Sequence, residues 1–97
     1  MLQITDLQNS LIAYHVGKPL RYDHSIRVKC HLPDADYHDI SQLRKFQAER
    51  DQALVWLQTE FGKASKERWS WARQGDWFFD VGFSNKADMI LFKLRWS

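Results

Sequence analysis

The sequence predicts one α+β domain, in which an antiparallel or mixed sheet carries two helices on one face. Three observations predict this class. Residues 26 to 32 alternate apolar and polar side chains, and residues 77 to 83 carry a large apolar side chain at every second position, which is typical of half-buried strands. Residues 40 to 61 and 87 to 96 place apolar side chains at helical spacing. A length of 97 residues corresponds to a single domain, 1–97.

The first half of the chain predicts two strands. The first covers 11–16 and is closed by Gly17 and Pro19. The second alternates clearly: one face carries Ile26, Val28, Cys30 and Leu32, and the other carries Arg27, Lys29 and His31. A turn over 33–36 follows, since Pro and Asp are common turn residues.

The first helix is expected to be capped by Asp39 and to end at Gly62. Its apolar positions recur as Ile40, Leu43, Phe46, Ala53, Leu54, Leu57 and Phe61. Residues 47 to 52 are polar all round. The helix therefore either frays there or splits, with Asp51 capping a second piece.

Two aromatic-rich strands, 68–73 and 77–83, flank a short loop and predict an antiparallel hairpin. Ser84 or Asn85 is expected to cap the last helix. Its predicted core-facing stripe is Ala87, Ile90, Leu91 and Leu94, flanked by Met89, Phe92 and Trp96. The order is β-β-α-β-β-α, a ferredoxin-like half-fold whose vacant sheet edge the 11–16 strand is expected to fill.

Composition narrows the class without deciding the partner. The net charge is +2 and the pI near 8.8, which is only a weak attraction toward phosphates. The longest apolar runs are too short to cross a bilayer, and the first residues lack the pattern of a signal peptide. A single cysteine, Cys30, excludes an internal disulfide. We expect a cytoplasmic protein with no membrane association.

The segment from Cys30 to Asp39 holds a thiol, two imidazoles and three carboxylates, which makes it a candidate metal site. Cys30 and His31 are adjacent on a strand and point to opposite faces. That leaves His31, His38 and one aspartate, without a recurring zinc spacing. Phosphate-loop and nucleophile-elbow motifs are also lacking. We expect no metal, no cofactor and no enzymatic activity.

The open side of the predicted sheet is a candidate surface for RNA or single-stranded DNA. Phe78 is expected there, beside three basic side chains, Arg27, Lys29 and His31. One aromatic ring and several cations would suit a base and its phosphates. Asp80 argues against this interpretation, because it would repel phosphate and pair with Arg27 or Lys29.

A second basic group flanks the hairpin and has Trp69 and Trp71 interleaved with it; its members are Lys63, Lys66, Arg68 and Arg73. Exposed Trp and Arg side chains are typical anchors of protein interfaces. Alternatively, both tryptophans pack under a helix or against the N-terminal strand. Strand geometry puts them on one face, so they should be buried or exposed largely together.

The C-terminal half carries the residues Trp56, Phe61-Gly62, Arg68-Trp69 and Phe92-Lys93-Leu94-Arg95-Trp96. This pattern resembles small α+β proteins of tailed bacteriophages. The resemblance covers about half the chain and implies a compact viral domain that works in the cytoplasm of the infected bacterium. It brings no catalytic residues.

We therefore expect a small non-enzymatic binding protein, an inhibitor or adaptor that acts on a host or phage protein through its sheet and hairpin. A nucleic-acid-binding module that uses the open sheet face is the alternative. A monomer or a homodimer is expected, since an unpaired edge strand can pair with a second copy.

Overall fold

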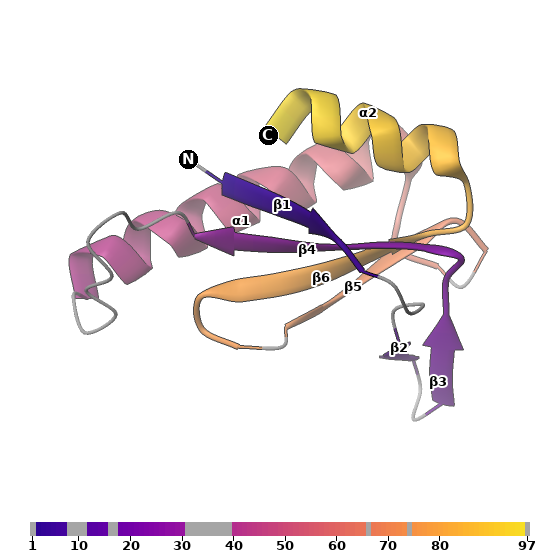
Figure 1. The fold of residues 1–97 in the computed structure, drawn as a ribbon, viewed down its shortest axis with the longest axis horizontal. Helices are drawn as coiled ribbons and strands as arrows, with labels where there is room; N and C mark the ends of the chain where they lie inside the picture. Colours follow the sequence, from indigo (N-terminus) through magenta and orange to yellow (C-terminus); the bar gives the residue numbers. More distant parts are fainter. Residues whose placement is uncertain are drawn as a thin grey trace.

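A computed structural model describes residues 2–7, 12–15, 18–30, 40–65, 67–73 and 75–96 of the chain. The elements, in order, are β1 (Leu2–Asp6), β2 (Ile12–His15), β3 (Lys18–Arg21), β4 (His24–Cys30), α1 (Ile40–Phe61), β5 (Trp69–Arg73), β6 (Phe78–Phe83) and α2 (Lys86–Trp96) (Figure 1). The turn expected at 33–36 and the cap expected at Asp39 lie outside the described residues.

The main sheet has four antiparallel strands in the order β1-β4-β6-β5. Both helices contribute to the core on one face of this sheet. The α+β class and the β-β-α-β-β-α order are confirmed, and the arrangement is consistent with a ferredoxin-like half-fold. The alternation of β4 and β6 also holds, because Ile26, Val28, Phe79, Val81 and Phe83 are all buried.

The strand at the sheet edge differs from the prediction. Residues 12–15 are a strand, but it pairs with β3 in a separate two-stranded sheet. Its partner β3 includes Lys18 and Pro19, which the sequence placed in a turn. The edge beside β4 is filled by β1, where Leu2 is buried opposite Cys30. β1 turns only two apolar side chains inward, Leu2 and Ile4. An alternating pattern this short does not predict a strand.

Helix α1 runs without interruption through its polar middle. Phe46 and Ala53 are both buried and lie two turns apart on the same face, so the core contact continues across 47–52. The helix ends as predicted at Gly62, which has φ of +82° and donates its N–H to the Gln58 carbonyl. Glycine suits this left-handed position, because it has no Cβ to clash.

Helix α2 begins at a cap supplied by Asn85, whose Oδ1 accepts the Ala87 N–H at 2.8 Å. The predicted core-facing stripe is wrong. Met89 and Phe92 are buried, whereas Ile90 and Leu91 are each 44% exposed and Leu94 is 77% exposed. The reason is the size of the aromatic side chains that α2 turns toward the core. Turning Phe92 and Trp96 inward lets both rings meet Trp56 of α1, with centroids 6.0 and 6.5 Å away.

Candidate binding surfaces

The open face is the side of the main sheet that points away from the helices. The pairing register arranges its side chains in three rows across the strands. The rows are Gln3, Lys29 and Phe78; then Thr5, Arg27, Asp80 and Ala72; then Ser25, Gly82 and Ser70. Three of the predicted site residues, Arg27, Lys29 and Phe78, are therefore brought together here.

The middle row is organised by an ion pair. Arg27 Nε donates to Asp80 Oδ1 at 2.9 Å, and Nη2 donates to Oδ2 at 3.1 Å. The Asp80 side chain is only 4% exposed and that of Arg27 is 35% exposed. The hydrogen bond to Asp80 raises the pKa of Arg27 above its usual value. The predicted pairing of Asp80 with a neighbouring cation is thus found, and it neutralises much of the positive charge of Arg27.

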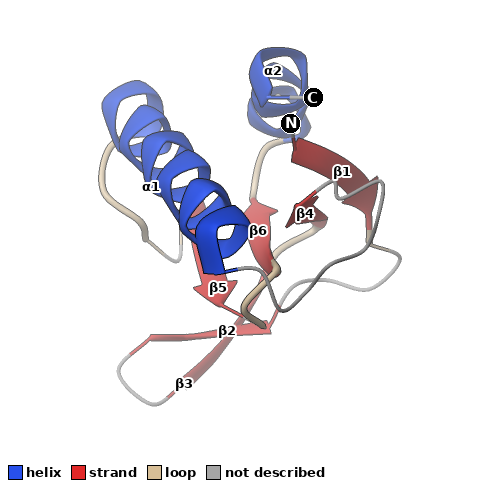
Figure 2. Cartoon of the chain, turned by 90° about the vertical axis from the view of Figure 1, so that its left-hand side faces the viewer, coloured by secondary structure: helices blue, strands red, loops and turns tan. Residues whose placement is uncertain are grey.

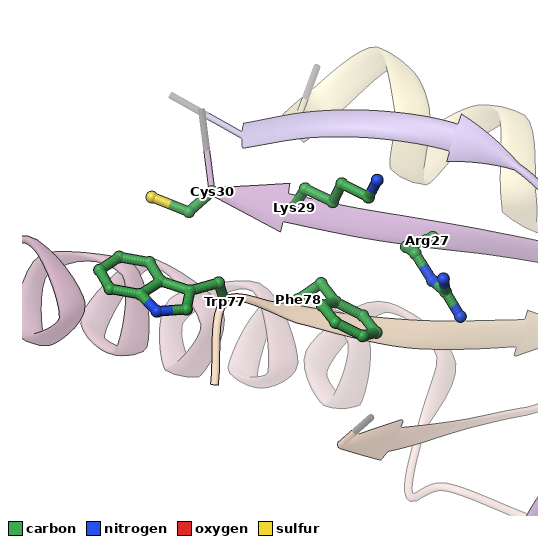
Figure 3. Close-up of a pocket in the computed structure, with 5 residues that line it drawn as sticks. All are labelled: Arg27, Lys29, Cys30, Trp77 and Phe78. Atoms are coloured by element: carbon green, nitrogen blue, oxygen red, sulfur yellow. The ribbon is translucent and has the colours of Figure 1, made fainter. Parts of the chain in front are cut away.

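A shallow hollow of about 330 Å³ lies at the end of the open face nearest Cys30. Its lining residues are Arg27, Lys29, Cys30, Trp77 and Phe78 (Figure 3). The guanidinium carbon of Arg27 stands 4.5 Å from the centre of the Phe78 ring, so the ring already holds a cation of the same chain. Burial raises the pKa of the Cys30 thiol, which disfavours the reactive thiolate.

The opposite end of the open face is covered by the chain itself. Tyr22 is buried, and its hydroxyl donates to the Ser65 carbonyl at 2.8 Å. Its ring lies so close to Gly82 that a Cβ there would be 2.6 Å from a ring carbon. Burial raises the pKa of Tyr22. The β2–β3 hairpin also approaches β5 near this end (Figures 1 and 2). The uncovered part of the open face is therefore smaller than the sequence predicted.

The second predicted group does not form one surface. Trp69 is fully buried and donates its indole N–H to the Gly62 carbonyl at 2.9 Å, so it is not accessible to a partner. Trp71 points to the same side, as strand geometry predicted, and is half-buried edge-on against Phe79. Arg68 and Arg73 are exposed but pair with Asp88 and Asp76, respectively.

The remaining predicted residue, His31, and the metal candidate His38 lie outside the described residues. Within the part of the chain that the structure describes, no group of three or more His, Cys, Asp or Glu side chains could hold a metal ion.

One exposed surface was not predicted, because its residues were expected to face the core. We call it the outer stripe, and it consists of Ala87, Ile90, Leu91 and Leu94 of α2. All four are exposed. A helix turns about 100° per residue, so this stripe lies on the side of α2 opposite the buried Met89 and Phe92 and the partly buried Trp96. The sequence does contain evidence for the observed orientation of α2, because positions 89, 92 and 96 also have helical spacing and carry the larger side chains.

Comparison of the chain with known protein families, curated proteins and solved structures found no match. No helix in the described ranges is long and apolar enough to cross a membrane.

Proposed function

We propose that this chain is a small protein-binding module, not an enzyme, and that it docks its partner on the outer stripe. The exposed apolar side chains of α2 carry this proposal. Single exposed leucines are common on protein surfaces, but a contiguous apolar group is typical of interaction sites. Ile90, Leu91 and Leu94 lie within two turns of one helix face and form such a group.

The stripe contributes none of the buried side chains of the core. The sheet is already covered on that side by Met89 and Phe92 of α2 and by four buried residues of α1. Burying the exposed remainder of each large side chain would contribute on the order of 1 kcal/mol. A partner that covers all three would gain about 3 kcal/mol from this burial, and the rest of the binding free energy would come from burial of the partner's own apolar side chains.

The open face supports nucleic-acid binding less well. Single-strand platforms offer several aromatic rings and a groove of free cations. Here Arg27 is held by Asp80, Phe78 is stacked with Arg27, and Tyr22 occupies the other end of the face. The carboxylate in the middle row would also repel phosphate.

Affinity capture from bacterial lysate tests the proposal with three baits: the native chain, Leu94→Asp and Val55→Asp. Val55 is the matched control, because it is 62% exposed on α1 and lies outside the stripe. We expect one protein to be retained by the native and Val55→Asp baits, to be lost with Leu94→Asp, and to survive nuclease treatment. Retention that nuclease abolishes would favour the nucleic-acid alternative, and equal retention by all three baits would contradict the proposal.

The resemblance to phage proteins gives this proposal a biological setting. We propose that the partner is a host or phage protein and that the chain acts on it as an inhibitor or adaptor. Identification of the retained protein by mass spectrometry tests this part directly.

A further inference from the structure

The two flanks of the outer stripe carry more positive than negative charge. Lys86 and Lys93 lie along one flank, and Asp88 and Arg95 lie along the other. Two of these charges are neutralised within the chain, because Lys93 pairs with Asp6 of β1 and Asp88 pairs with Arg68. Lys86 and Arg95 are exposed, and neither has an ion-pair partner among the residues that the structure describes. Within the described part of the chain, one cation without an ion-pair partner therefore borders the stripe on each side, and the Arg95 guanidinium also lies over the Trp96 ring.

The shape of the stripe indicates which kind of element it accepts. From Ala87 to Leu94 it extends about 10 Å along the helix, which is two turns. Ala87 is small and permits close approach at one end, while Ile90, Leu91 and Leu94 form ridges that a second helix can interleave with its own. A partner helix would meet the stripe through apolar side chains spaced over about two turns.

From these observations we infer that the outer stripe binds an amphipathic helix of a partner protein whose apolar face is bordered by acidic side chains. This inference rests on the proposed function and specifies its partner. Glu or Asp side chains on both borders of such a helix would meet Lys86 and Arg95. A second copy of this chain fits less well, because Asp88, the acidic side chain that borders its own stripe, is already paired with Arg68.

Two synthetic helical peptides test the inference by fluorescence anisotropy. Both carry the same leucine stripe, and they differ only in having glutamates or lysines along its borders. We expect the glutamate peptide to bind the native chain about tenfold more tightly at low salt. The preference should shrink strongly near 1 M NaCl, where the Debye length falls to about 3 Å. In Lys86→Glu/Arg95→Glu the preference should reverse.

A matched control separates local charge from net charge. Arg44→Glu/Lys45→Glu makes the same change in net charge at exposed positions of α1, away from the stripe, and should keep the preference of the native chain. If this control loses the preference as well, long-range attraction explains it and the inference is overturned. Lys86→Glu alone repeats the test without disturbing Arg95, which stacks on Trp96.

The outcomes distinguish the inference from the proposed function. Equal binding of both peptides, abolished by Leu94→Asp, would overturn the charge inference and leave apolar docking intact. Binding of neither peptide would overturn the inference, while the lysate experiment would still decide the proposed function. A stable dimer of the native chain that Leu94→Asp converts to a monomer would show that a second copy covers the stripe, and it would overturn both.

Discussion

The open face of the sheet and the outer stripe of α2 both lie outside the core. They differ in how far the chain itself satisfies their side chains. On the open face, Arg27 and Asp80 satisfy each other and Tyr22 packs on Gly82. On the outer stripe, Leu94 is 77% exposed and lies outside the hydrophobic core cluster. Surface charge and aromatic content therefore do not by themselves make a surface available to a partner. Side chains that are paired or packed within the chain stabilise the fold. Apolar side chains that the chain leaves exposed are available to a partner.

The largest contrast is expected between the two sides of α2. Phe92→Ala should lower the free energy of unfolding by about 3–5 kcal/mol, because it removes a buried ring that contacts Trp56 and Phe83. Leu94→Ala should change it by less than about 0.5 kcal/mol. Urea denaturation of both variants measures the difference. A similar cost for the two substitutions would mean that the outer stripe is part of the folded core.

A smaller effect is expected on the open face, where Arg27 and Asp80 form an ion pair. Arg27→Ala should lower the free energy of unfolding by about 2–4 kcal/mol, because it leaves the buried Asp80 carboxylate without its partner. Arg73→Ala, which breaks the exposed pair with Asp76, is the control and should cost less than about 1 kcal/mol. Thermal and urea unfolding report both values. An Arg27→Ala variant as stable as the control would show that the open face is not organised by this pair.

The smallest of the three effects concerns the covered end of the open face. Gly82→Ala should destabilise the domain by about 1–3 kcal/mol, since the new methyl group would force the Tyr22 ring to move. Tyr22→Ala in the same chain should reduce the additional cost of Gly82→Ala, because the obstructing ring is gone. A double-mutant cycle in urea measures this coupling. Additive costs would show that Tyr22 does not rest on Gly82.

The parts of the fold that were predictable are those with a strong periodic signal. Alternation located β4 and β6 and placed Arg27, Lys29 and Phe78 together on the open face. Register then made the pairing of Asp80 with Arg27 foreseeable. Strand geometry also put Trp69 and Trp71 on one side, and glycine chemistry located the end of α1 at Gly62.

The other features depend on competition between segments that are far apart in the sequence. Both 11–16 and β1 could occupy the edge beside β4, and the sequence does not rank them. Helix α2 has two apolar stripes on opposite sides, so periodicity alone does not say which one faces the sheet. The aromatic rings of α1 and β6 decide in favour of Phe92 and Trp96. The position of Tyr22 depends on Gly82, which lies 60 residues later in the chain.

The ring cluster at the junction of the two helices has an optical consequence. Trp56 stands edge-on to Phe61 and Trp96, and the Phe92 ring is tilted against both tryptophans. Chromophores held at fixed angles give a near-ultraviolet circular dichroism band that vanishes when their orientations become random. The part of the ellipticity that Trp56 and Trp96 supply thus reports whether α2 is seated on the sheet. A ligand that settles on the far side of that helix should leave this band in place, whereas one that lifts the helix away should weaken it, with Trp69 and Trp71 of β5 supplying the remainder.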